Sequence, residues 1–210
     1  MARILIATIL VVLLAACTTV TGSGNLVNRS FDLDGFSRID ASHGAQVEVT
    51  RADTFSIHVE VDDNVAPELD VSVSGDTLFI GLNIDSQSNV TFRVQVTMPE
   101  LKGVTTSGGS RLQAVLAGED LSVSASGGSR ATLTGTAGRV TIGASGGSQV
   151  LLGDLAAGNV ELSASGGSHV EINSSGRVSG NASGGASITV AGSPTSVDVA
   201  TSGGASVTTK

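Results

Sequence analysis

The fold is decided by a unit that begins twice in the stretch 123–152, which reads VSASGGSRATLTGTAGRVTIGASGGSQVLL. Its Ser-Gly-Gly element recurs through the C-terminal half at spacings of 19, 19, 20, 18 and 19 residues. Recurrence at a nearly fixed spacing is the signature of a repeat architecture. The six copies are Ser107-Gly108-Gly109, Ser126-Gly127-Gly128, Ser145-Gly146-Gly147, Ser165-Gly166-Gly167, Ser183-Gly184-Gly185 and Ser202-Gly203-Gly204.

Apolar residues keep a fixed place in each unit. Five residues after the serines stand Leu112, Ala131, Val150, Val170, Ile188 and Val207, and most residues two positions further on are apolar as well. A period of two predicts a strand with one buried face. The same pattern precedes the serines, so each unit holds two short strands, and the glycine pair supplies the positive φ that a sharp corner needs.

Units of about 19 residues cannot bury their own apolar faces and therefore stack. We predict an all-β chain, a parallel β-helix or β-solenoid with about 19 residues per coil, each strand pairing with its equivalent about 4.8 Å away. The repeated corner serines Ser110, Ser129, Ser148 and Ser168 are expected to stack into a ladder of hydroxyls that hydrogen-bond to one another. A disordered Gly/Ser linker is the alternative, but it would not keep branched residues in register.

The region before the repeats has a different composition. Residues 27–101 hold all five Phe and 13 of the 19 acidic residues, and alternation persists there. We expect further strands around a thicker core, forming wider first coils that cap the stack. The predicted organisation is a signal peptide at 1–16, a lipidated Cys with a flexible tether at 17–28, an N-terminal β region at 29–103 and the Ser-Gly-Gly solenoid at 104–210.

The N-terminus has the layout of an export signal. Arg3 precedes a short apolar run that ends at Leu14-Ala15-Ala16-Cys17, which resembles the bacterial lipobox. Cys17 is the only cysteine, so no disulfide within the chain is expected, and we predict that it carries the lipid that holds the protein at a membrane. Ordinary signal cleavage beside an incidental cysteine is the alternative. By resemblance to the lipoprotein sorting rule, Thr18 favours the outer membrane, and we expect an exported protein of the cell envelope.

Few residues suggest a reaction. Ser145 sits in a G-x-S-x-G match, but a strand rather than a helix is expected to follow it. Glu161 and Asp198 fall two coils apart on one face, near the upper separation of inverting glycosidase carboxylates, although solvated surface carboxylates are the simpler interpretation. Asp120, Arg139, Asn159 and Arg177 alternate in another column, which suits pairing between coils.

Cofactor, metal and nucleic-acid sites are not expected either. His43, His58 and His169 lack metal-ligand spacing, and His169 is predicted to point outward in a column with Arg111, Arg130 and Gln149. The acidic residues Asp62, Asp63, Glu68 and Asp70 lack the spacing of calcium-binding loops. A net charge of -8 without a basic cluster argues against DNA or RNA as partners.

Several segments together resemble a known family. Phe36-Ser37-Arg38-Ile39, Val47-Glu48-Val49, Leu78-Phe79-Ile80 and Met98-Pro99-Glu100-Leu101, followed by the iterated Ser-Gly-Gly-Ser, are similar to the head GIN domain family, whose members are commonly labelled "putative auto-transporter adhesins". The resemblance covers roughly Ser30 to Lys210. It implies a right-handed parallel β-helix in secreted or lipid-anchored envelope proteins, and it brings no catalytic residues.

These patterns lead to one functional expectation, a lipid-anchored envelope protein with a non-catalytic, adhesin-like binding role toward a protein or glycan. The alternatives are a polysaccharide-cleaving β-helix enzyme that uses Glu161 and Asp198, and a structural scaffold lipoprotein. An uncovered strand edge is expected after Val207, and we expect it to pair with another copy of the protein or with a partner.

Overall fold

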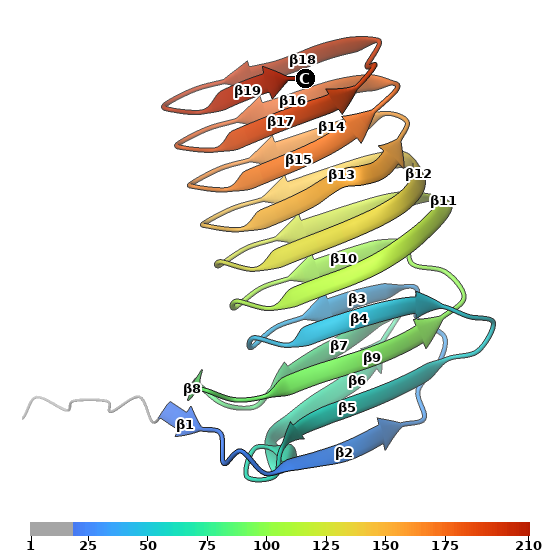
Figure 1. The fold of residues 1–210 in the computed structure, drawn as a ribbon, viewed down its shortest axis with the longest axis vertical. Helices are drawn as coiled ribbons and strands as arrows, with labels where there is room; N and C mark the ends of the chain where they lie inside the picture. The colour runs from blue at the N-terminus through green and yellow to red at the C-terminus, as the bar shows by residue number, and fades with distance from the viewer. Residues whose placement is uncertain (1–18) are drawn as a thin grey trace, which may run out of the picture.

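Two layers of strands face each other and stack coil upon coil in the computed structural model, which describes residues 19–210 (Figure 1). The front sheet, from base to top, contains β2 (Leu26–Phe31), β5 (Ser56–Asp62), β9 (Phe92–Met98), β4 (Gln46–Arg51), the first parts of β11 (Arg111–Ala125) and β12 (Arg130–Ala144), β13 (Gln149–Ala157), β15 (His169–Ser174), β17 (Ser187–Gly192) and β19 (Ser206–Thr209).

The back sheet is built from the other strand of each coil. It contains β6 (Leu69–Ser74), β7 (Thr77–Leu82), β3 (Arg38–Ala41), β10 (Gly103–Thr106), the second parts of β11 and β12, β14 (Val160–Ala164), β16 (Arg177–Ala182) and β18 (Ser196–Thr201). Two short strands, β1 (Thr19–Thr21) and β8 (Ser86–Ser88), pair beside the base, and a 3-10 turn spans Ala66–Glu68. From β4 and β3 upward, every pairing along the stack is parallel.

The Ser-Gly-Gly corners lie above one another along one ridge. Gly167 N–H donates to the Gly146 carbonyl at 2.7 Å, and Gly185 N–H donates to the Gly166 carbonyl at 2.7 Å, so each corner is bonded to the one below. The strands beside the corners follow the same register, with Arg111 opposite Arg130. The predicted β-solenoid with a period of about 19 residues is thereby confirmed.

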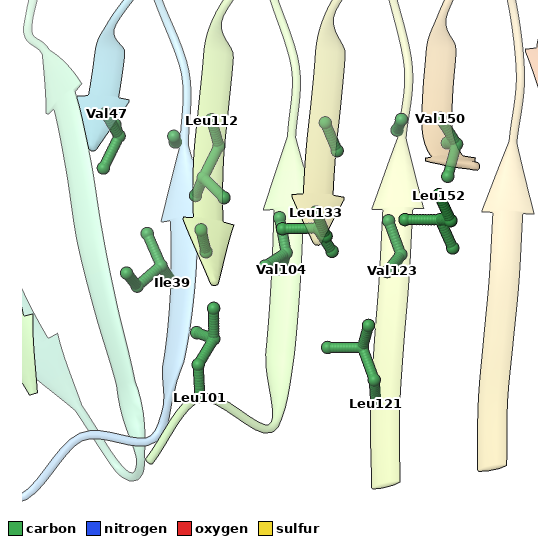
Figure 2. Close-up of a cluster of buried hydrophobic side chains, with 14 of the residues drawn as sticks. Ile39, Val47, Leu101, Val104, Leu112, Leu121, Val123, Leu133, Val150 and Leu152 are labelled. Carbon is green, nitrogen blue, oxygen red and sulfur yellow. The ribbon is translucent and has the colours of Figure 1, made fainter. Parts of the chain in front are cut away.

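Side chains from both sheets fill the space between them, and the interior of the repeat region contains no ring (Figure 2). The inward positions predicted from the two-residue period are buried through the middle coils, as Leu112, Leu133, Val150 and Leu152 show. Exposure rises only in the last coil, where Val197 is 37% exposed. Within the described chain, β18 and β19 each pair on one side only, which accounts for that exposure.

The hydrogen-bond partners of the corner serines differ from the prediction. The hydroxyls of Ser110 and Ser129 donate to the carbonyls of Ala41 and Thr106, in the coil below, at 2.8 and 2.9 Å. Ser110, Ser129 and Ser148 also accept a bond from the N–H three residues earlier in their own corner, each at 3.2 Å. The predicted ladder is therefore wrong, because the hydroxyls of Ser110 and Ser129 donate to backbone carbonyls and not to another serine; the neighbouring hydroxyl is Thr106 Oγ1, 3.0 Å from Ser129 Oγ. Ser168 Oγ is buried without a partner among the described residues.

The base of the stack is a cap of hairpins. Strands β3 and β4 form a coil directly below β10 and β11, and the intervening residues 52–102 descend and return to build the base. There, β2, β5 and β9 pair antiparallel, as do β6 and β7. Phe36 and Phe92 are buried in this thicker core, and the ring centroids of Phe36 and Phe55 lie 4.8 Å apart.

Strand β3 turns into β4 through one more corner, Ser42-His43-Gly44, in the same ridge as the Ser-Gly-Gly copies. Gly44 N–H donates to the Gly108 carbonyl at 3.0 Å, which joins this corner to the next. His43 has a φ of 54°, close to the 55° of Gly108 above it. A side chain thus occupies a left-handed position that glycine fills in the later corners.

The predicted flexible tether is wrong for its described part. Thr19–Thr21 pair with Ser86–Ser88, and β2 begins at Leu26. Between them, the buried carboxylate of Asp62 accepts the N–H groups of Gly24 at 2.6 Å and Thr91 at 2.7 Å. This bonding fixes a segment that its composition alone would leave mobile. Cys17 and the predicted signal peptide lie outside the described residues, and no helix within residues 19–210 has the length and hydropathy needed to cross a bilayer.

Two glycines in this scaffold should respond very differently to substitution. A Cβ at Gly180 would overlap the Leu162 carbonyl of the coil below, at a φ of 144°, whereas a Cβ at Gly147 would meet nothing within 4 Å. We expect Gly180→Ala to lower the free energy of unfolding by more than about 2 kcal/mol through strain and lost pairing. Gly147→Ala should change it by less than about 0.5 kcal/mol. Denaturant unfolding of both variants measures the difference, and equal effects would contradict the close stacking of coils at Gly180.

A matched pair of serines tests the corner hydrogen bonds. Ser129→Ala removes the hydroxyl bonded to the Thr106 carbonyl and to the Ser126 N–H, so we expect a loss of about 1 kcal/mol. Ser168→Ala removes a buried hydroxyl without a partner among the described residues and should leave stability unchanged or raise it. Thermal unfolding of the two variants side by side decides this, and a larger loss at Ser168 would show that its hydroxyl is bonded.

Candidate binding surface

Open grooves lie on the outer faces of the two sheets, between rows of side chains. On the front sheet, a groove of about 260 Å³ lies between Arg93 and Arg111 and is floored by Gln46. A neighbouring groove of about 220 Å³ continues toward Thr132 and Thr134 of β12. These are long, open surfaces, and their shape suits an extended partner better than a small enclosed substrate.

One register position on the front sheet carries a column of basic and amide side chains. We call it the basic column; from base to top it consists of Arg93, Gln46, Arg111, Arg130, Gln149 and His169, each opposite the next. The outward orientation predicted for His169 beside Arg111, Arg130 and Gln149 is confirmed by this register. Below Arg93 lies Glu60, whose carboxylate pairs with the Arg93 guanidinium at 2.7 Å.

The back sheet carries the alternating column that the sequence suggested for pairing between coils. Its contacts run through the backbone: Asp120 Oδ1 accepts the Arg139 N–H at 2.8 Å, and Asn159 Oδ1 accepts the Arg177 N–H at 2.9 Å. The Arg177 guanidinium pairs instead with Asp198 at 2.9 Å. The Asp120 and Asn159 side chains thus bond to the backbone of the next coil. The alternation of acidic, amide and basic residues in the sequence does not predict these backbone partners.

The residues considered for catalysis are placed as surface and corner groups. Ser145 begins a corner followed by strand β13, so the strand-to-helix turn of a nucleophile elbow is missing at this serine. Glu161 and Asp198 lie in one column with Ser179 between them, two coils apart as predicted. Asp198 is exposed and paired with Arg177. This arrangement offers a surface ion pair and not a buried acid facing a base.

The histidines and the acidic residues of the base lie apart. His58 Nδ1 is 2.9 Å from Ser30 Oγ, and His169 Nε2 is 3.0 Å from Glu171 Oε1. The Asp62 carboxylate accepts hydrogen bonds from the backbone N–H groups of Gly24 and Thr91. Within residues 19–210, no group of three or more His, Cys, Asp or Glu side chains is placed to hold a metal ion.

Asp40 is a residue that the sequence analysis did not single out. It lies on the outer face of the back sheet between Phe79 of β7 and Thr105 of β10. Burial raises the pKa of Asp40 above its usual value of 3.8. Phe79 beside it is 39% exposed, because its neighbours Leu78 and Ile80 take the inward positions of β7. The alternation of Leu78-Phe79-Ile80 was the available signal for an outward ring.

Comparisons with known proteins agree on the fold. A family model described as "Putative auto-transporter adhesin, head GIN domain" matches residues 35–194. A solved "putative adhesin" from Bacteroides fragilis NCTC 9343 has a TM-score of 0.74 at 21% identity, covering 91% of this chain and 100% of that chain. Comparison with curated proteins gives no match.

Two further solved structures resemble the chain. A "putative adhesin" from Parabacteroides merdae ATCC 43184 has a TM-score of 0.58 at 18% identity, covering 91% of this chain and 99% of that chain. A "Putative lipid binding protein" from Parabacteroides distasonis ATCC 8503 has a TM-score of 0.54 at 18% identity, covering 92% of this chain and 100% of that chain. At these identities the likeness concerns the fold alone.

The raised pKa of Asp40 predicts a pH dependence of stability. The folded state binds this proton more tightly than the unfolded chain, so stability falls as pH rises from 3.8 through the raised pKa. We therefore expect Asp40→Asn to be more stable than wild type at neutral pH, and the difference to vanish below pH 3.8. Denaturant unfolding across this pH range measures both chains. A difference that persists at low pH would show that burial of the charge is not its cause.

Proposed function

The chain belongs to the head GIN domain family, and from that membership we propose that it is an exported envelope protein, held by lipid on Cys17, whose solenoid binds an extended partner without catalysing a reaction. The observation that supports a binding role most is the position of the grooves. They run along open sheet faces lined by polar side chains at a regular spacing. The adhesin label of the family and of two of the solved structures is consistent with this role.

The placement of the first described strand supports the proposed anchor. Thr19 pairs with Ser86 at the base of the stack, and only one residue separates it from Cys17. A lipid on Cys17 would hold the base of the solenoid close to the bilayer surface. The coils of β17, β18 and β19 lie at the opposite end of the stack (Figure 1). Such a mount leaves the outer faces of both sheets accessible above the membrane.

The proposed anchor is tested by Cys17→Ser in the full chain, produced in a bacterium with two membranes. We expect wild type to incorporate labelled palmitate and to require detergent for release from the membrane fraction. The Cys17→Ser chain should take up no label and leave the membrane fraction. Thr18→Ser is the matched control, because it alters the adjacent residue without removing the thiol, and it should behave like wild type. Equal membrane retention of both variants would contradict lipid anchoring at Cys17.

The non-catalytic part is tested on the same preparations. Beads carrying the full-length protein should retain intact glycan or protein ligands over long incubation, with no new reducing ends or cleaved products. Steady release of product that is lost in Glu161→Gln would overturn this part and favour the polysaccharide-cleaving alternative.

A further inference from the structure

The basic column is unusual for a protein with this charge. The chain has 19 acidic residues against 11 Lys and Arg, yet six successive rungs of the front sheet present Arg, Gln or His at one position and no carboxylate. Adjacent rungs are about 4.8 Å apart, so the column extends over about 24 Å. Three arginines thus lie along one line of the front sheet, and no carboxylate stands in the column itself.

Two arginines at the centre of the column lie side by side. Arg111 and Arg130 are directly opposite in register on β11 and β12, and both are exposed. Like charges that face each other across neighbouring strands destabilise a sheet. The Arg130 guanidinium donates to Gln149 Oε1 at 2.6 Å, while the Arg111 guanidinium makes no hydrogen bond or ion pair with the described side chains of residues 19–210. Neither guanidinium forms an ion pair with a described side chain, and an external anion would relieve the repulsion between them.

Amide groups surround these guanidiniums. The groove of about 260 Å³ is lined by the side chains of Gln46, Gln95 and Gln113 between Arg93 and Arg111, with Glu48 among them. Each amide offers both a donor and an acceptor, whereas the carboxylate of Glu48 accepts from hydroxyls and would repel an acidic group placed beside it. A guanidinium fork matches a carboxylate or sulfate with two parallel hydrogen bonds. The groove therefore combines sites for an acidic group with sites for many hydroxyls.

We propose that the basic column binds an extended acidic glycan, with its carboxylate or sulfate groups on Arg111 and Arg130 and its hydroxyls on the flanking glutamines. This inference rests on the proposed binding role and names the class of ligand. The linear column suits a chain-like ligand, and its sparse charge suits a polymer with acidic groups separated by neutral sugars. Duplex nucleic acid carries one charge per about 1.7 Å, a much denser charge than the few arginines of the column can neutralise.

The experiment uses the full-length protein in detergent and two probes in which acidic and neutral sugars alternate, a hyaluronan oligosaccharide for carboxylates and a monosulfated keratan sulfate oligosaccharide for sulfates. We expect at least one of them to bind with an affinity that falls as salt rises. The double variant Arg111→Gln, Arg130→Gln should weaken that binding by about tenfold or more, because it removes both charged forks. The matched control is Arg139→Gln, an exposed arginine of the back sheet, which should retain wild-type affinity.

Each outcome bears on the proposal. Unchanged thermal unfolding of the variants shows that any loss of affinity is local. Failure of both acidic probes to bind, equal loss in Arg139→Gln, or equally tight binding of a carboxyl-reduced neutral oligosaccharide would overturn the assignment of an acidic glycan to this column. Tighter binding of a DNA duplex than of either glycan would also overturn it. Retention of another ligand by wild-type beads in those cases would leave the broader binding role standing.

Discussion

Parallel backbone pairing between equivalent positions of successive coils is the constraint on which this structure depends. No single coil encloses a core, because its two strands contribute only a few Val, Ile, Leu and Ala side chains to the interior. The pairing brings these small groups into two continuous facing layers. It also requires close approach at the corners, where carbonyls such as that of Gly146 bond to the next Gly-Gly pair above. At Gly166, an added Cβ would lie only 2.9 Å from the Gly146 carbonyl oxygen of the coil below.

The same pairing decides what the surface looks like. A residue's place within the unit fixes the neighbours of its side chain, so outward residues form columns along the stack. Arg111 and Arg130 meet because their positions in two units are the same, and Asp120 reaches the backbone of Arg139 for the same reason. Binding surfaces in such a molecule arise by changing one position over several coils, without altering the core.

The periodic part of the fold was accessible from sequence, while the aperiodic part was not. The spacing of Ser-Gly-Gly and the alternation around it predict the coils, the inward residues such as Leu133 and the outward column that ends at His169. The route of residues 52–102 was not predictable, because hairpins of similar composition can pair in several orders. The corner at His43 was missed because it lacks the glycine pair.

The hydrogen-bond partners of particular atoms were also not predictable from the sequence. Repetition suggested that Ser110 and its equivalents would bond to one another, whereas backbone carbonyls such as that of Ala41 are the acceptors. Polar residues near Thr19 suggested a flexible tether, yet a buried carboxylate far away in sequence, Asp62, holds that segment. Such contacts depend on the position of single atoms across long separations in sequence, which composition and spacing do not encode.

The coil-on-coil register is tested most directly by introduced cysteine pairs, since Cys17 is the only native cysteine. Gln113→Cys with Thr132→Cys places the two thiols at directly paired positions on adjacent coils, within the Cα separation of about 4.4–6.8 Å that a disulfide needs. Gln113→Cys with Thr136→Cys is the matched pair out of register. Mild oxidation should crosslink the first pair rapidly within one chain and leave the second unlinked. Equal crosslinking of both pairs, or a link only in the second, would contradict the parallel stack.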